Sequence, residues 1–352
     1  MIQNPFRASL GVLLTVVCLG VCLICLLYLP ALLPVWFMDT YSSSVYPFWQ
    51  YVWGELHPGS RWLLADFLWP TTALLLLIRL IWLGFRYVWW FWPFRAVLEV
   101  LLWAGLLTLL FMVSWGLNYH KASLYRQYVS ELDSAELSPV DWIFAIQQSR
   151  AARPKEISEV CEDKFSFSLI TFQPKTVVNR WFESEGMPEA PDIEVKTTLW
   201  SPVYTRLSIA GMFTPITGEA TISNSIFVMV QPFTKAHEFA HWAGYAFEQD
   251  ADLIAYLALW QAQDPWIVYA GWLQWWHSIG APAEYRTLLG KEVNQDLDCY
   301  SRWQANKPRW RFQHLFWQAY DQQLKAQGVV EGIASYRLGE AVALKALRAD
   351  SR

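Results

Sequence analysis

Charged residues are scarce in this sequence. Only 16% of its 352 residues are Asp, Glu, Lys or Arg, and the net charge is −4. Nucleic-acid-binding proteins normally carry a basic face, so this balance argues against that class. Cysteine is scarce as well, with five residues in all. Cys161 and Cys299 lack the paired spacing of a zinc ribbon. They could form a disulfide on the outer face of a membrane or remain two buried thiols, and both alternatives stay open.

Long apolar runs are missing after Tyr119, which predicts that residues 119–352 form a folded domain outside lipid. Residues 1–118, by contrast, contain long apolar runs. Residues 9–38 contain no charge, and two further apolar runs follow. About 20 apolar residues suffice to cross a bilayer. We therefore expect a membrane domain, residues 1–118, with three transmembrane helices at about 9–36, 62–83 and 96–117.

Basic residues near these runs predict the orientation. Arg7 precedes the first run, and Arg79, Arg86 and Arg95 lie in or near the connection between the second and third. Cytoplasmic loops carry an excess of Lys and Arg, so the N-terminus and this connection are expected inside. Three crossings then place residues 119–352 outside the cytoplasm. The protein is expected in the cell (inner) membrane as a multi-pass protein, with the lipid bilayer as a partner and no nucleic acid.

The extramembrane part is expected to be mostly α, with a small β-sheet. The sequence SPVDW at 138–142 has the pattern of a helix start, with Ser138 as the N-cap. Residues 220–230, ATISNSIFVMV, are rich in β-branched residues and predict a strand. Thr234 is then expected to cap the next helix. The strand could be a sheet edge that binds extended peptide, or an ordinary core strand.

The stretch KAHEFAHWAGYAFEQDADLIAYL, residues 235–257, contains the pattern HExxH. His237 and His241 are four positions apart and share one face of a helix, so both imidazoles can bind one Zn²⁺. Glu238 lies beside them and can act as general base toward a metal-activated water. The five-residue pattern is common by chance, so a third ligand is needed to support a metal site.

A straight helix could not supply that ligand from this stretch. Glu248 lies 11 residues after His237, which is about 16 Å along a helix axis. Gly244 can end the helix with a left-handed turn, and a second helix can begin near 247. Glu248 would then point back at the metal, and Asp252 could orient a ligand imidazole. We expect both histidines and Glu248 to hold one Zn²⁺ per chain in a zincin-like domain, with the fourth position left for water.

A solvated polar helix face is the competing explanation for these groups. The surrounding sequence AHEFAHWAGYAF is strongly apolar, and unpaired charge buried there is costly, which favours the metal site. Glu219, in a turn before the expected strand, is a possible cleft residue. An oxyanion stabiliser is also required. Tyr204, Tyr245 and Tyr256 are candidates, and the sequence does not choose between them.

These motifs resemble known families. EQDAD at 248–252 resembles the ExxAD element of membrane zinc peptidases of the CAAX prenyl protease type, in which the Glu is the third metal ligand. The compact pattern HExxHxxGxxxExxAD is similar to a bacterial family of three-helix membrane proteins, described only as a domain of unknown function and presumed to be metallopeptidases. This sequence departs from that pattern at Asp250 and Asp252, where Glu and Asn are expected.

The resemblance covers nearly the whole chain. It includes WGLNY at 115–119, GMFTPITGEATIS at 211–223 and QLKAQGVVEGIASY at 323–336. It implies a gluzincin-like hydrolase, in agreement with the roles assigned above to the residues of the HExxH stretch. It implies no substrate, so the peptide or protein that would be cleaved is not identified.

Three functions therefore stay open. The first is a membrane-anchored zinc metalloendopeptidase. The second is a membrane protein in which zinc only stabilises the fold. The third is a metal-free scaffold that binds partners through aromatic stretches such as 85–95 and 271–277, although such stretches also suit a membrane interface. Metal content separates the scaffold from the other two, and Glu238→Gln separates the enzyme from the non-catalytic zinc protein.

Overall fold

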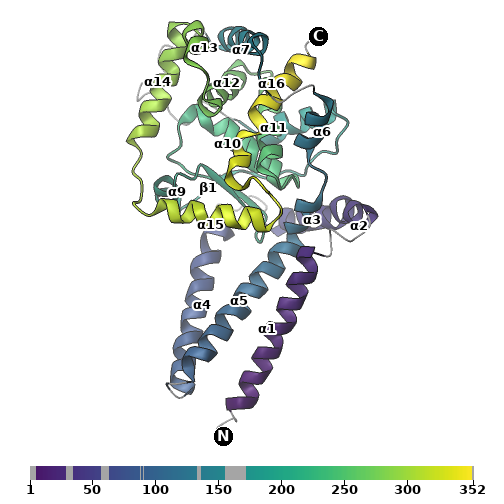
Figure 1. Ribbon diagram of the computed structural model, residues 1–352, viewed down its shortest axis with the longest axis vertical. Helices are drawn as coiled ribbons and strands as arrows, with labels where there is room; N and C mark the ends of the chain where they lie inside the picture. The colour runs from purple at the N-terminus through teal and green to yellow at the C-terminus, as the bar shows by residue number, and fades with distance from the viewer. Residues whose placement is uncertain are drawn as a thin grey trace. The chain divides into compact units, whose positions relative to one another are not determined.

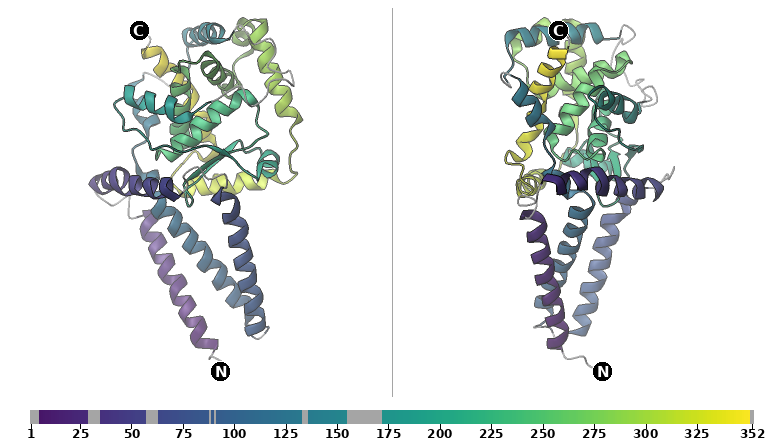
Figure 2. Two further views of the ribbon diagram at one scale, coloured as in Figure 1. Left: turned by 180° about the vertical axis from the view of Figure 1, so that it is seen from behind. Right: turned by 90° about the vertical axis from the view of Figure 1, so that its right-hand side faces the viewer.

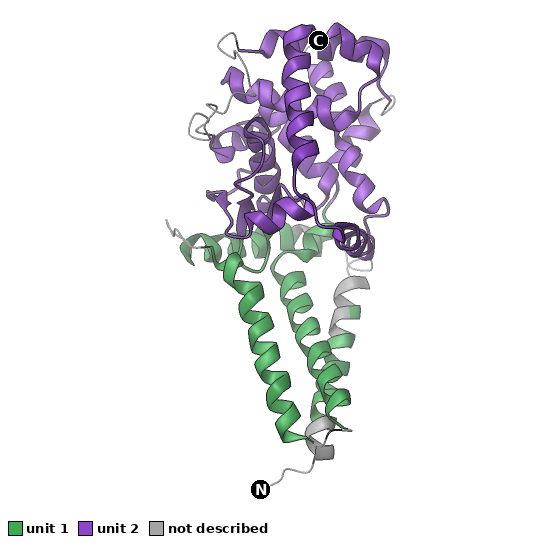
Figure 3. Ribbon diagram, turned by 90° about the vertical axis from the view of Figure 1, so that its left-hand side faces the viewer, with its two compact units in different colours: residues 1–121, 214–218 green, residues 122–213, 219–352 purple. Residues whose placement is uncertain are grey.

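The computed structural model is mostly helical, with one small sheet (Figure 1). By its internal contacts the chain divides into two compact units (Figure 3). The first comprises Met1–Lys121 and Thr214–Gly218, and the second comprises Ala122–Phe213 and Glu219–Arg352. The structure describes residues 5–28, 35–56, 63–87, 89, 91–132, 136–154 and 172–350.

The first unit contains three long helices, α1 (Pro5–Tyr28), α4 (Leu64–Arg86) and α5 (Trp92–Ser114). By length and composition, α4 and α5 could each cross a membrane. Only 6% and 22% of their apolar windows are buried. Such extensive exposed apolar surface is unusual in a soluble protein and suits lipid.

The prediction of three transmembrane helices is wrong in number, because two described helices meet these criteria. In α1 the apolar helix among the described residues is Leu10–Val21, which is shorter than a span. Within the run 9–38 the structure describes two helices, α1, which spans Pro5–Tyr28, and α2, which begins at Val35.

A helical stretch that was not predicted follows α1. It consists of α2 (Val35–Thr40), the π-helical η2 (Tyr41–Val45) and α3 (Tyr46–Leu56). Within the first unit it runs across the direction of α4 and α5 (Figure 2). Trp36, Phe48 and Tyr51 are exposed on it. Aromatic rings on a helix of this orientation suit a membrane–water interface. The 3₁₀ helix η3 (Gly116–His120) ends this unit's main segment.

The second unit is built around α11 (Glu248–Trp260), every residue of which is buried. It packs against α10 (Gln231–Trp242) and α12 (Pro265–Ile279). The remaining helices of this unit are α6 (Leu124–Glu131), α7 (Pro139–Ala152), α8 (Pro174–Ser184), α9 (Ser201–Leu207), α13 (Ala283–Leu288), α14 (Lys291–Asn306), α15 (Gln313–Ala326), α16 (Gly339–Asp350), and the 3₁₀ helices η5 (Val228–Val230) and η6 (Gly332–Arg337).

The predicted start of α7 is confirmed. Ser138 is the N-cap, its side chain accepts a hydrogen bond from the Asp141 backbone N–H, and the Asp141 side chain accepts one from the Ser138 backbone N–H. This reciprocal pair is a capping box, and Pro139 occupies the first helical turn, where its missing N–H costs nothing.

The sheet has three short strands, β1 (Lys196–Thr197), β2 (Gly211–Thr214) and β3 (Glu219–Ile222), in the order β1-β3-β2. β1 and β3 are parallel, with Lys196 opposite Thr221. The predicted strand 220–230 is therefore too long, and it lies in the centre of the sheet rather than at an edge. Apolar side chains of β3 and its neighbours form a small core with Val195, Ile222 and Ile226.

The predicted cap at Thr234 is also wrong. The helix α10 begins three residues earlier, at Gln231, and the Thr234 hydroxyl donates to the Val230 carbonyl within it. Pro232 occupies the first turn, a position that proline favours. The earlier start places both histidines in the second half of the helix.

Tryptophans of α12 are core residues rather than surface residues. Trp272, Trp275 and Trp276 are buried, so neither interpretation of 271–277 as an aromatic surface holds. In the stretch 85–95, by contrast, Phe85 and Trp89 are almost fully exposed. Cys299 is disulfide-bonded, while Cys161 lies outside the described residues.

Candidate metal centre

The site begins with the turn at Gly244. Its φ of +89° is left-handed backbone, which glycine adopts without strain. The Tyr245 N–H donates to the Ala240 carbonyl at 3.1 Å, and the Gly244 N–H donates to the His241 carbonyl at 3.0 Å. This pair of bonds is a Schellman motif, which ends α10 and reverses the chain. Four residues after Gly244, α11 starts at Glu248 and brings that side chain back toward α10.

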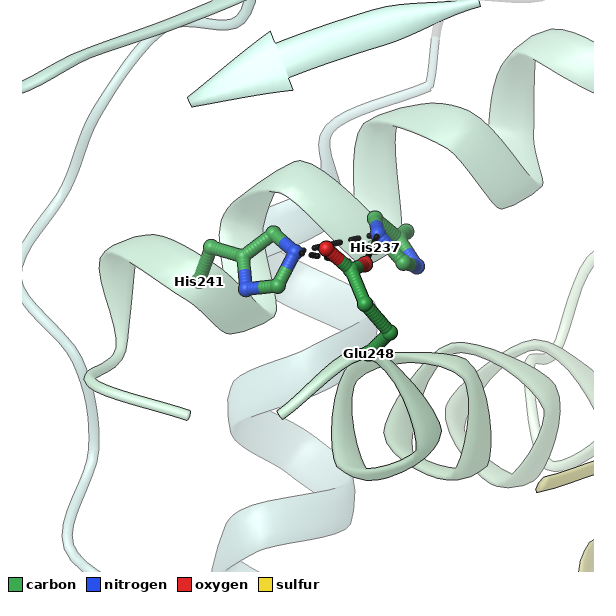
Figure 4. Close-up of side chains that lie close together, drawn as sticks. All are labelled: His237, His241 and Glu248. Atoms are coloured by element: carbon green, nitrogen blue, oxygen red, sulfur yellow. Dashed lines mark hydrogen bonds and ion pairs between the residues drawn. The ribbon is translucent and has the colours of Figure 1, made fainter. Parts of the chain in front are cut away.

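Three ligand atoms converge there, as Figure 4 shows. The Nε2 atoms of His237 and His241 are 3.1 Å apart. Glu248 Oε2 lies 3.1 Å from the first and 3.3 Å from the second. Tetrahedral Zn²⁺ with bonds of about 2.0–2.1 Å separates its ligand atoms by about 3.3–3.4 Å. The group could therefore hold a metal ion with little movement, and its nitrogen and oxygen donors suit zinc.

Hydrogen bonds to the other ring nitrogens orient both imidazoles. His237 Nδ1 lies 2.7 Å from Asp252 Oδ1, and His241 Nδ1 donates to the Tyr245 carbonyl at 2.7 Å. A carbonyl can only accept, so His241 carries its proton on Nδ1 and its neutral form offers a lone pair on Nε2. The same tautomer of His237 follows from its carboxylate partner. The Nε2 lone pairs of the two histidines and the Glu248 carboxylate face one another and are all electron-rich. They repel one another unless a cation or a proton lies between them.

The electrostatics of the site agree with this requirement. Burial lowers the pKa of His237, but the carboxylates of Asp252 and Glu248 raise it further, and the net pKa lies well above its ordinary value. Burial raises the pKa of Glu248, but His241 and His237 lower it, and the net pKa lies below its ordinary value. Both shifts favour the charged forms, so the buried ligands favour a positive charge between them.

Glu238 lies beside the ligands and is buried against the strand β2. Burial raises the pKa of its carboxyl to about 7, against the lowering effect of the two histidines and of a hydrogen bond from the Phe213 backbone N–H. An ideal Cβ on Gly211 would come within 2.7 Å of Glu238 Oε1. Glycine is therefore needed at 211 for the strand to pass this close to the carboxylate. A carboxyl with a pKa near neutrality suits proton transfer.

Two further residues of the site were missed by sequence reasoning. The Tyr320 hydroxyl donates to Glu248 Oε1 at 2.7 Å, and the Tyr336 hydroxyl lies 3.3 Å from that of Tyr320. The Tyr336 ring is nearly parallel to the imidazole of His237, at an angle of 12°. Tyr336 ends the stretch 323–336 that carries the family resemblance, which is the one signal in the sequence that could have found it.

The other predicted residues lie elsewhere. Asp250 accepts hydrogen bonds from Ser123 Oγ and from the backbone N–H groups of Leu124 and Tyr125, and thereby holds the start of α6. Glu219 is buried as the first residue of β3, and its role in a cleft stays a prediction.

The three tyrosines proposed as oxyanion stabilisers have other partners. The hydroxyls of Tyr204 and Tyr245 donate to the sulfur atoms of methionines, and the Tyr256 hydroxyl bonds to Ser278. Tyr245 still contributes to the site through its backbone carbonyl, which accepts from His241.

The family model described as "Protein of unknown function (DUF3810)" matches residues 41–344, so the chain belongs to this family. The resemblance to a family of unknown function is thereby confirmed, while metallopeptidase activity stays a prediction. No curated protein and no solved structure matches the chain. An account of the function therefore starts from the geometry of the site.

Proposed function

We propose that this member of the DUF3810 family is a membrane-anchored zinc metallopeptidase. The observation that carries the proposal is the convergence of His237, His241 and Glu248 on one point next to the buried Glu238. Structural zinc sites are closed by four protein ligands, whereas catalytic sites use three and keep one position open. Among the residues that the structure describes, the group capable of holding a metal has three members.

The reaction follows from the positions of these side chains. The two histidines and Glu248 would hold Zn²⁺, which supplies Lewis acidity by lowering the pKa of water and polarising a carbonyl. Glu238 accepts a proton from the attacking water, and the hydroxide adds to the carbonyl carbon of the peptide bond. Glu238 then returns that proton to the amine nitrogen as the C–N bond breaks. One water is consumed, and a carboxylic acid and an amine leave.

The strand β2 offers a place for an extended peptide. It is an outer strand in the order β1-β3-β2, unlike β3, which has neighbours on both sides. The Phe213 N–H of β2 reaches Glu238, so a peptide that pairs with this strand passes close to the general base. Main-chain pairing of this kind holds a substrate with little dependence on its side chains.

The membrane unit supports an extracytoplasmic site. Arg79, Arg86 and Arg95 lie in or near the connection between α4 and α5, which favours a cytoplasmic position for that connection. If α4 and α5 both cross the membrane, residues after Ser114 lie outside the cytoplasm. This holds whether or not α1 also crosses. The disulfide at Cys299 agrees with an oxidising compartment. A reporter fused after Arg352 should therefore behave as extracytoplasmic, and cytoplasmic behaviour would reverse the proposed orientation.

Metal analysis of the purified protein combined with Glu238→Gln tests the proposal. The wild type should carry about one Zn²⁺ per chain, and the double variant His237→Ala, His241→Ala should carry none. Glu238→Gln should retain zinc and lose cleavage of a peptide library that the wild type cleaves. Zinc retained without cleavage by either form would favour the alternative in which the metal only stabilises the fold.

A further inference from the structure

The two oxygens of Glu248 have different partners. Oε2 faces the two histidines at 3.1 and 3.3 Å, while Oε1 accepts the hydrogen bond from the Tyr320 hydroxyl at 2.7 Å. A carboxylate that must present one oxygen to a metal can rotate about its last torsion unless the other oxygen is held. The Tyr320 hydroxyl supplies that restraint from α15, an element far from α11 in the sequence.

Tyr336 completes a pair of hydroxyls at the same place. Its oxygen lies 3.3 Å from that of Tyr320, and its ring is stacked over His237 with the centroids 6.2 Å apart. A tyrosine hydroxyl carries its proton at neutral pH and can donate it in a hydrogen bond. The group is therefore a neutral hydrogen-bond donor beside two of the three metal ligands.

The short segment that carries Tyr336 is fixed against the helix that carries Tyr320. Asp321, the next residue on α15, accepts a hydrogen bond from the Ile333 backbone N–H at 3.0 Å. Lys325 bonds to the other oxygen of Asp321 at 2.7 Å. Gly332 adopts a φ of +57° directly before that contact. The two tyrosines are thus presented by one connected piece of structure rather than by independent loops.

We propose that Tyr320 is a positioning residue for Glu248, and that Tyr336 is a catalytic residue that donates a hydrogen bond to the carbonyl oxygen of the scissile bond. This inference rests on the proposed function. Hydrolysis builds negative charge on that oxygen, and a donor already in place stabilises it. Two tyrosine hydroxyls lie at the ligands in the described structure: that of Tyr320 donates to Glu248, and that of Tyr336, whose ring stacks on His237, is the one assigned to the substrate oxygen.

The role of Tyr320 is tested by zinc affinity alone. Tyr320→Phe removes the hydroxyl and keeps the ring. The zinc dissociation constant should rise about 10- to 100-fold, as when other hydrogen bonds to a metal-ligating side chain are lost. Tyr300→Phe is the matched control, since this buried tyrosine bonds to Gln274 and touches no ligand. Full-length protein in detergent micelles is titrated with zinc against a chromophoric chelator. An unchanged constant in Tyr320→Phe overturns its role.

The role of Tyr336 is tested on zinc-loaded protein with a phosphinic dipeptide, whose tetrahedral oxygens mimic the charged oxygen of the reaction. Tyr336→Phe should keep zinc affinity within about twofold of the wild type and weaken phosphinate binding about 10- to 100-fold, the effect of a lost hydrogen bond to a charged group. Equal phosphinate binding by both proteins overturns the assignment, as does absence of binding by zinc-loaded wild type. A wild type that binds no zinc instead overturns the proposed function itself.

Discussion

The Nδ1 atom of His237 on α10 lies 2.7 Å from Oδ1 of Asp252 on α11, and both side chains are buried. This contact fixes the imidazole so that Nε2 points at the other ligands. Asp252→Ala should therefore weaken zinc binding about 10- to 100-fold without removing a ligand. A chelator titration measures the change, and Glu248→Ala should be worse than Asp252→Ala because it removes a ligand outright.

Asp250, two residues earlier on the same helix, is the control for that prediction. It accepts hydrogen bonds from the Ser123 hydroxyl and from the backbone N–H groups of Leu124 and Tyr125, where α6 begins. Asp250→Ala should leave zinc affinity unchanged and lower the free energy of unfolding by about 1–3 kcal/mol, because backbone N–H groups at the start of α6 lose their acceptor. If Asp250→Ala proves the most damaging to zinc binding, the assignment of Glu248 as third ligand is wrong.

The turn at Gly244 is the basis of a second prediction. A β-branched residue at a φ of +89° is strained, so Gly244→Val should misplace α11 and abolish zinc binding as fully as Glu248→Ala does. Gly280→Val is the control, since Gly280 ends α12 with a φ of +66° and no atoms crowd its Cβ position. It should lower the melting temperature in a similar way and keep its zinc. Equal zinc loss in both variants would contradict a specific role for the turn.

The sequence predicted those parts of the site that follow from spacing along the chain. His237, Glu238 and His241 share one helical turn, and Gly244 marks where that helix ends. Local rules suffice for such groups, because the helical repeat and the left-handed turn fix their geometry. The mostly helical fold with a small sheet and the capping box of Ser138 follow from the same kind of rule.

Tertiary packing determines what the sequence did not predict. Tyr320 reaches Glu248 across 72 positions of the chain, and no periodicity links the two. The tryptophans of α12 suggested an interface, yet a buried helix can be equally rich in aromatic residues. The number of spanning helices was misjudged because an uncharged run in the sequence need not form an apolar helix of spanning length: among the described residues, α1 contributes the shorter apolar helix Leu10–Val21. For Tyr320 and for the tryptophans of α12, long-range packing decided what the local pattern could not.

Gly211 gives a third prediction, which separates chemistry from metal binding. In Gly211→Ala the new methyl group would lie 2.7 Å from Glu238 Oε1, so the general base or the strand must move. Zinc affinity should be unchanged, and kcat should fall by about 100-fold, as for a base displaced by about 1 Å. Gly54→Ala, on α3 with open space around it, is the control and should keep wild-type kcat. Equal kcat values in Gly211→Ala and wild type would show that Glu238 needs no such close approach.

Glu340, in the first turn of α16, supports a prediction about pH. Its side chain is buried, and its Oε2 has no hydrogen-bond partner among the residues that the structure describes. Burial, and then the nearby Asp252, raises the pKa of the Glu340 carboxyl to about 8. The folded protein thus keeps a proton that the unfolded chain loses above its ordinary pKa of 4.5. Stability from this group is present below pH 4.5 and is lost as the pH rises toward 8.

Glu340→Gln should remove that loss, because glutamine is neutral at every pH and has nearly the same shape. The variant and the wild type should unfold alike near pH 4.5, and the variant should be more stable by a few kcal/mol at about pH 8.5. Thermal unfolding in detergent with chelator present measures the difference, since removal of metal leaves the comparison to the protein alone. Glu284→Gln, at an exposed position, is the control and should show no such trend. A Glu340→Gln variant that gains nothing at alkaline pH would mean that the buried carboxyl finds compensation for its charge within the fold.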